Sequence, residues 1–139
     1  MPAGLHTASA DEVQALCARL LQFNQQATGL SFDDTALHLV WRDAHGQLRA
    51  GLLGEVCASW LNIHVLWVDP DLRGQGIGAT LLAAAETQAR QLGAIGAALD
   101  TFDWQAEAFY RAQGYAEFGR LHDCPPGHQR IYLQRRFAT

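Results

Sequence analysis

Apolar and polar residues alternate along the first of three consecutive stretches in the first half of the chain, and the other two are largely apolar; each stretch predicts a β-strand. The stretches cover residues 37–42, 48–58 and 61–68. Residues 43–47 are rich in turn-forming side chains, so the first two strands are expected to form an antiparallel hairpin. The three strands together predict the beginning of a sheet.

A helical spacing of apolar residues precedes these strands. A cap at Ser9 or Asp11 predicts a helix that runs to about Gln25, and Gly29 ends the region. A short strand over residues 5–8 is expected before it. The apolar stripe of this helix is expected to be buried, with Cys17 as a small buried hydrophobe; it consists of Val13, Leu16, Cys17, Leu20 and Leu21.

The strand at 61–68 begins a strand–helix–strand unit. The helix is expected from Ile77 to Leu92, and the next strand covers residues 95–102. Such a unit predicts two parallel strands joined by a right-handed crossover. One helix face is expected to pack on the sheet, through Ile77, Leu81, Leu82, Ala85, Ala89 and Leu92.

The remaining pattern predicts a short helix over residues 104–113 and an antiparallel strand pair over residues 115–121 and 129–137. The sequence contains no internal repeat, linker or low-complexity tract. With 139 residues, the chain is expected to form one α/β domain over residues 1–139.

Charge and cysteine content narrow the class of protein. Ten basic and fourteen acidic residues give a net charge of -4, which does not favour nucleic acid or an anionic membrane as partner. Residues 1–7 lack the features of a signal peptide, and no apolar run approaches the length of a membrane span, so a cytoplasmic protein is expected. Three widely separated cysteines predict neither a disulfide framework nor a zinc site.

The most informative segment is Arg73-Gly74-Gln75-Gly76-Ile77-Gly78, which joins a predicted strand to a predicted helix. Glycines allow the backbone to approach a ligand closely, and the first N–H groups of a helix have no partner within the helix. Such a loop favours an anion, and Arg73 adds a guanidinium suited to phosphate oxygens. The sequence therefore predicts a ligand with a phosphate or pyrophosphate.

Two other phosphate loops were compared with this segment. The nucleotide-triphosphatase loop is excluded because no lysine follows the last glycine. The dinucleotide fingerprint fits the spacing of Gly74, Gly76 and Ala79, with Asp100 about twenty residues further on. In that fingerprint the first glycine directly follows the strand, whereas Pro70 and a turn intervene here.

The loop resembles the acetyl-CoA signature of the GCN5-related N-acetyltransferase (GNAT) superfamily. Residues 109–115 are similar to its second motif, an aromatic residue and tyrosine followed by glycine and a further aromatic residue. The two motifs cover the chain from about Asn62 to Tyr115, and residues 101–106 and 125–128 resemble small bacterial members. The resemblance implies a mixed, mostly antiparallel twisted sheet flanked by helices, with a central parallel strand pair splayed around acetyl-CoA.

The resemblance also implies which residues bind acetyl-CoA. Backbone groups of the strand end are expected beside the pantetheine arm, the loop beside the pyrophosphate, and the second motif beside the thioester. The expected residues are Leu66, Trp67, Val68, Arg73, Gly74, Gln75, Gly76, Ile77, Gly78, Ala79, Gln105, Phe109 and Tyr110.

Three residues are expected to take part in catalysis. Tyr110 matches the family position that protonates the departing thiolate. Asn62 occupies the position where many members have a glutamate base, so His64 or a water is expected to accept the proton of the amine, histidine being the side chain whose unperturbed pKa lies near neutrality. Asp103 replaces an asparagine common in the family, and Gln105 is expected to supply the missing amide.

These observations predict an N-acetyltransferase that moves acetyl from acetyl-CoA to a primary amine of a small molecule or peptide, by direct attack within a ternary complex. The alternative is a non-catalytic module that binds acyl-CoA or a dinucleotide. No metal is expected, because no recognised ligand spacing connects His122, Asp123, Cys124 and His128. A homodimer is compatible with the resemblance.

Overall fold

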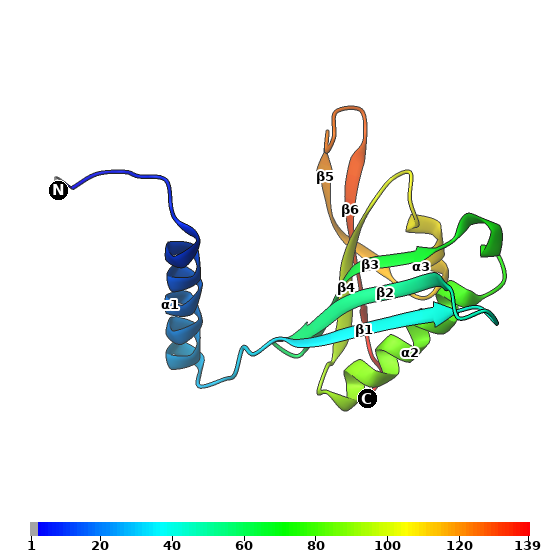
Figure 1. Cartoon of the computed structure of the whole chain (residues 1–139), viewed down its shortest axis with the longest axis horizontal. Coiled ribbons are helices and arrows are strands. Elements are labelled where there is room, and N and C mark those ends of the chain that lie inside the picture. The colour runs from blue at the N-terminus through cyan, green and yellow to red at the C-terminus, as the bar shows by residue number, and fades with distance from the viewer. Residues whose placement is uncertain (1–2) are drawn as a thin grey trace. The chain divides into compact units, whose positions relative to one another are not determined.

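The computed structural model describes residues 3–139, which form two compact units divided between Asp33 and Asp34. The first unit contains helix α1 (Ala10–Thr28) (Figure 1). Its N-terminus is a capping box: the Ser9 side chain accepts a hydrogen bond from the Glu12 N–H, and the Glu12 carboxylate accepts one from the Ser9 N–H at 2.9 Å. Gly29, at φ 71°, ends the helix.

Two predictions for this unit are wrong. Residues 5–8 lie in no strand, because a strand needs a ladder partner for its backbone groups and residues 3–33 contain no other strand. The apolar stripe is exposed, with Leu16 at 60% and Cys17 also exposed. Among residues 3–33, α1 is the only helix or strand, so no other described element of this unit covers the stripe.

The second unit is built on one six-stranded sheet with the order β1-β2-β3-β4-β6-β5. The β3–β4 pair is parallel and the other neighbours are antiparallel, which confirms the predicted mixed sheet. The strands are β1 (Thr35–Arg42), β2 (Leu48–Cys57), β3 (Trp60–Val68), β4 (Gly96–Phe102), β5 (Ala116–His122) and β6 (Gln129–Arg136).

Helix α2 (Ile77–Gln91) packs on this sheet and contacts β1 to β4. It buries the predicted face except for Leu92, which is 48% exposed because it lies one residue beyond the last helical residue. Helix α3 (Glu107–Ala112) is shorter than predicted. Its expected first turn is replaced by a bend at residues 103–106, held in part by the Gln105 side chain, which accepts the Phe102 N–H at 3.0 Å.

The core lies between the sheet and α2. The largest fully buried side chains come from three strands and from α2; they are Leu52, Leu61, Leu82, Ile131 and Leu133. This packing fixes the position of β3 relative to α2, and therefore the position of the loop between them.

The parallel pair separates at one end, as predicted. Pairing runs from Trp60 opposite Gly96 to Ile63 opposite Leu99 and then stops, although β3 continues to Val68 and β4 to Phe102. The backbone of residues 64–68 is therefore not paired with β4. This separation opens the sheet beside the glycine-rich loop.

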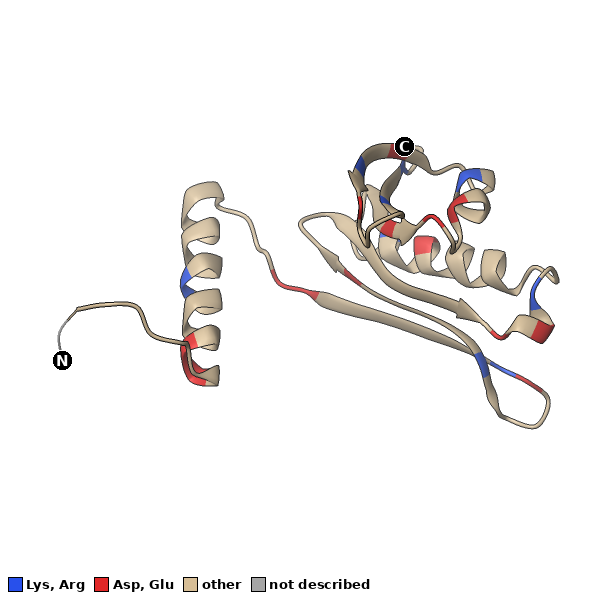
Figure 2. Ribbon diagram, turned by 90° about the horizontal axis from the view of Figure 1, so that it is seen from above, with Lys and Arg blue, Asp and Glu red and all other residues tan. Residues whose placement is uncertain are grey.

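Charged side chains of the second unit are largely combined into ion pairs. Figure 2 shows basic residues (blue) next to acidic residues (red) at several places on this unit. Arg49, Arg111, Arg120, Arg130 and Arg135 all form ion pairs with carboxylates. Within residues 3–139, no helix combines the length and apolar character that a bilayer-crossing helix needs.

Candidate active site

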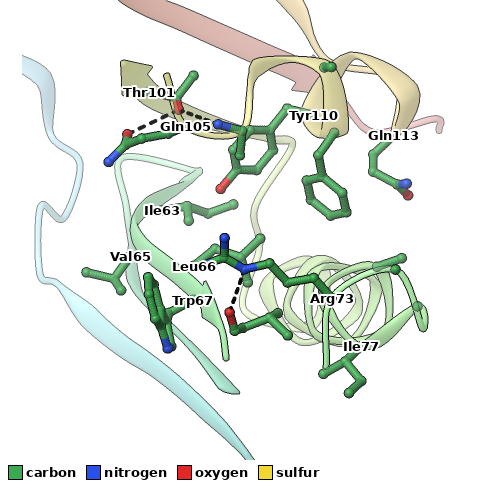
Figure 3. A pocket seen from close by; sticks show the side chains of 18 of the residues that line it. Ile63, Val65, Leu66, Trp67, Arg73, Ile77, Thr101, Gln105, Tyr110 and Gln113 are labelled. Atoms are coloured by element: carbon green, nitrogen blue, oxygen red, sulfur yellow. Dashed lines mark hydrogen bonds between the residues drawn. The ribbon is translucent and has the colours of Figure 1, made fainter. Parts of the chain in front are cut away.

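A cavity of about 910 Å³ lies where β3 and β4 separate (Figure 3). One wall is the second half of β3, and the opposite wall comes from the end of β4, the bend at residues 103–106 and α3. The glycine-rich loop and the first turn of α2 form its remaining side. The cavity is thus a direct consequence of the interrupted strand pairing.

The cavity gathers nearly all of the predicted cofactor residues. Gln75 is the exception, since it is exposed and does not line the cavity. Of the predicted catalytic residues, Tyr110 and His64 line the cavity and Asn62 does not. Lining residues that the sequence reasoning missed include Ile63, Val65, Leu72, Asp100, Thr101, Trp104 and Gln113.

The glycine-rich loop has the geometry of an anion site. Gly74 and Gly76 adopt φ angles of 81° and 84°, in the left-handed region that favours glycine. A Cβ atom at either position would meet no other atom within 4 Å, so the space beside the loop is open. Gly76 precedes α2 and no side chain caps this helix, which leaves its first N–H groups available to a phosphate.

Arg73 lies against the end of β3. Its Nε donates a hydrogen bond to the Val68 carbonyl at 2.9 Å, drawn as a dashed line in Figure 3. The guanidinium also lies 4.9 Å from the centre of the Trp67 ring, a cation–π distance. Contact of Arg73 with a phosphate stays a prediction, because a different rotamer would be needed to direct the guanidinium away from β3.

The turn before the glycine loop is fixed by Arg49 of β2, which the sequence reasoning missed. Its guanidinium donates to Asp69 at 2.8 Å and to Asp71, and reaches Asp43 at 3.4 Å. The pKa of Asp69 is lowered by the hydrogen bond from the Trp67 indole and by the one from Arg49. These contacts connect the β1–β2 hairpin to the start of the anion-binding loop.

Tyr110 has the properties of a proton donor. The residue is only 5% exposed, and Figure 3 shows its hydroxyl pointing into the cavity. Burial raises the pKa of Tyr110 to about 12, because the phenolate is poorly solvated there. The rings of Phe109 and Tyr115 contact it edge-on and fix its orientation. At neutral pH the phenol is therefore fully protonated.

His64 lies at an irregularity of β3. Leu53 pairs with Val65 and Gly54 with Ile63, so His64 has no opposite residue on β2 and forms a bulge. Its Nε2 contacts the carboxylate of Glu55, a residue that the sequence reasoning missed. The one available signal was an isolated acid in the largely apolar strand at residues 48–58.

Polar contacts also organise the opposite wall. The Gln105 amide oxygen holds the bend by accepting from Phe102, as described above, and the Thr101 hydroxyl contacts the same oxygen at 3.3 Å (Figure 3). Asp103 accepts hydrogen bonds from His128 and from the Gln129 N–H, each at 2.9 Å, and does not line the cavity. Among residues 3–139, no three His, Cys, Asp or Glu side chains gather as a metal site.

The parallel strand pair separates beside a glycine-rich helix N-terminus, with a buried tyrosine in the gap. This is the site that the GNAT resemblance implies for an acyl-CoA-dependent acyltransferase. Comparison with known proteins supports this class of enzyme. Residues 9–115 match the acetyltransferase (GNAT) family, and the chain belongs to this family. The enzyme is an acetyltransferase whose cosubstrate is acetyl-CoA.

Two relatives illustrate the match. Blasticidin-S acetyltransferase of Streptomyces morookaense is 45% identical over 83 residues, which are 59% of this chain and 61% of that protein. The match thus spans less than two thirds of that relative's length. Acetyltransferase Atu2258 of Agrobacterium fabrum is 33% identical over 130 residues, 94% of each chain.

Solved structures have the same fold. An acetyltransferase from Bacillus cereus superimposes with a TM-score of 0.90 at 28% identity, over 97% of this chain and 98% of that one. A protein of Bacillus anthracis named as a streptothricin acetyltransferase, solved with acetyl coenzyme A, gives a TM-score of 0.69 at 20% identity, over 76% of this chain and 65% of that one.

Proposed function

We propose that this chain transfers acetyl from acetyl-CoA to a primary amine of a small molecule, by direct attack of the amine within a ternary complex. The observation that carries the proposal is that one cavity joins the glycine-rich loop to both Tyr110 and His64. The name of blasticidin-S acetyltransferase supports a small molecule over a peptide as acceptor.

The loop and the strand end would hold the cosubstrate. N–H groups of the loop and of the first turn of α2 suit the pyrophosphate, and the unpaired backbone of residues 66–68 suits the amides of the pantetheine arm. Holding both reactants in attack geometry supplies a large part of the acceleration. A backbone N–H near Val68 would polarise the thioester carbonyl.

Tyr110 and His64 would move the protons. His64 accepts one proton from the ammonium, so that the free amine can attack the thioester carbon and form the C–N bond. Tyr110 donates its proton to the thiolate as the C–S bond breaks, and the second proton lost by the nitrogen restores the phenol. Of three ammonium protons, one leaves through His64, one reaches the thiol and one stays on the amide.

We place the reaction in the cytoplasm, which is reducing. Within residues 3–139, no disulfide involves Cys17, Cys57 or Cys124, as expected for a compartment where disulfides do not persist. Dimerisation stays a prediction.

The test is release of CoA from acetyl-CoA in the presence of a panel of amines, with the product identified by mass spectrometry. The panel contains blasticidin S, aminoglycosides, polyamines, arylalkylamines, amino acids and lysine peptides. The proposal expects CoA and an N-acetylated small molecule in equal amounts. Binding of acetyl-CoA without transfer to any amine would instead support the non-catalytic module, and transfer to lysine peptides alone would move the acceptor to proteins.

A further inference from the structure

The carboxylate of Glu55 contacts Nε2 of His64 across the strands β2 and β3. Glu55 does not line the cavity, whereas His64 does. We propose that Glu55 is a positioning residue: it accepts the Nε2 hydrogen of His64, which leaves Nδ1 as the atom that takes the proton of the acceptor ammonium. This inference rests on the proposed function and adds a residue to it.

The contact depends on the bulge in β3. Because His64 is the extra residue, the chain bends there and the imidazole comes beside Glu55, which pairs with Asn62. The strands approach so closely at this point that a Cβ on Gly54 would lie 2.4 Å from the Asn62 carbonyl oxygen. Only glycine fits at position 54. The close approach of the strands that requires this glycine occurs at the bulge, and the bulge brings His64 beside Glu55.

The pair also accounts for the asparagine at position 62. Paired residues of antiparallel strands project to the same side of the sheet, so Glu55 brings a carboxylate to the side on which Asn62 lies. The carboxylate is therefore supplied by Glu55 on the neighbouring strand β2, and it acts on the amine through His64. An ionised carboxylate that accepts from one ring nitrogen fixes the tautomer and raises the basicity of the other nitrogen.

The other charged or titratable groups that line the cavity are Arg73, Asp100 and Tyr110. From the glycine-rich loop, the Arg73 guanidinium is held at the Val68 carbonyl and over the Trp67 ring. From β4, Asp100 lines the cavity but its carboxylate is held by Arg130, at 2.8 and 2.9 Å. From α3, Tyr110 is neutral at physiological pH because its pKa is raised to about 12. Glu55 is the carboxylate in direct contact with the imidazole. The negative charge that stabilises the imidazolium is therefore assigned to Glu55.

The first test is the pH dependence of kcat/KM in two variants. Glu55→Gln keeps an oxygen acceptor and removes the charge, so kcat/KM should fall most near neutral pH, where the acceptor is mainly ammonium, and least at high pH, where the free amine is abundant. Glu55→Met removes charge and acceptor, so kcat/KM at neutral pH should fall about ten- to hundredfold, part of what a positioned base contributes. Glu12→Gln, which preserves the capping-box pattern of α1, is the control and should match the wild type.

The second test does not need turnover. Long-range proton–nitrogen spectra of the imidazole rings should show the wild-type His64 as the Nε2–H tautomer, and a mixture of tautomers in Glu55→Met. A wild type that transfers acetyl while both Glu55 variants superimpose on its profile and keep its tautomer overturns the role of Glu55 and leaves the proposed function standing. A wild type that acetylates no amine overturns the proposed function, and the catalytic role of Glu55 with it.

Discussion

At the scale of single residues, burial and the raised pKa of Tyr110 restrict its side chain to the role of a proton donor at neutral pH. Tyr110→Phe keeps the ring and removes the proton donor, so kcat should fall about ten- to ten-thousandfold while affinity for acetyl-CoA stays close to that of the wild type. Because burial raises the pKa of Tyr110 to about 12, above the ordinary value near 10, its ionisation should cause no loss of rate on the alkaline side until pH approaches that value. Steady-state kinetics across pH measures both effects.

Tyr115→Phe is the matched control. Tyr115 is equally buried, at 3% exposure, but its hydroxyl donates to Glu86 at 2.7 Å and the residue does not line the cavity. Its loss should lower stability and leave kcat unchanged. Equal kcat values for Tyr110→Phe and the wild type would assign the proton to water.

The sequence predicted most residues around the cavity because they belong to two continuous motifs. The sequence did not predict the role of Glu55, because its contact with His64 depends on the register of β2 against β3 and on a bulge. Trp104 was missed for a related reason. It lies in a bend fixed by side-chain hydrogen bonds of Gln105 and Thr101, which periodicity does not reveal.

At the scale of elements, the hairpin β1–β2 supports the glycine loop through Arg49. Arg49→Met should loosen the turn at residues 69–72 and raise the Kd for acetyl-CoA several-fold, with little change in kcat, since the anion site would lose its fixed geometry. Calorimetric titration measures the Kd. Arg42→Met, on the neighbouring strand, is the control and should bind like the wild type.

This effect should depend on pH in a defined direction. The pKa of Asp69 is lowered in the folded protein, by the Trp67 indole first and Arg49 second. The ionised carboxylate therefore stabilises the turn above its unfolded pKa, and the contribution is lost as pH falls through the lowered value. The difference in Kd between wild type and Arg49→Met should shrink on that acidic side. A difference that persists unchanged there would mean that Asp69 is not the partner that matters.

The helices and strands with strong periodicity were predicted correctly, whereas the residues at which they begin and end were predicted less accurately. The strands β1 to β4 and helix α2 follow from alternation and helical spacing. The prediction of a strand at residues 5–8 was wrong because an alternation over four residues does not specify a neighbouring strand to pair with. The prediction that Cys17 is buried was wrong because an amphipathic pattern predicts a buried stripe without specifying which element covers it.

At the scale of the whole molecule, the proposed function predicts direct transfer without an acetylated enzyme. None of the cysteines lines the cavity, and the chain contains no lysine. Initial rates with both substrates varied should therefore give intersecting double-reciprocal lines, and a Cys17→Ser, Cys57→Ser, Cys124→Ser variant should keep this pattern. Parallel lines, together with an acetyl group on the protein by mass spectrometry, would show a two-step transfer instead.

The central claim is that acetyl-CoA binds in the cavity where β3 and β4 separate, with its pyrophosphate on the glycine loop. Titration calorimetry of acetyl-CoA with Gly76→Val and Gly46→Val tests it most directly. Both glycines have a positive φ, 84° and 76°, with no atom within 4 Å of an added Cβ, so the backbone disfavours valine at both positions. Only Gly76 lines the cavity. The account predicts loss of binding in folded Gly76→Val and wild-type affinity in Gly46→Val, and equal affinities in the two variants would contradict it.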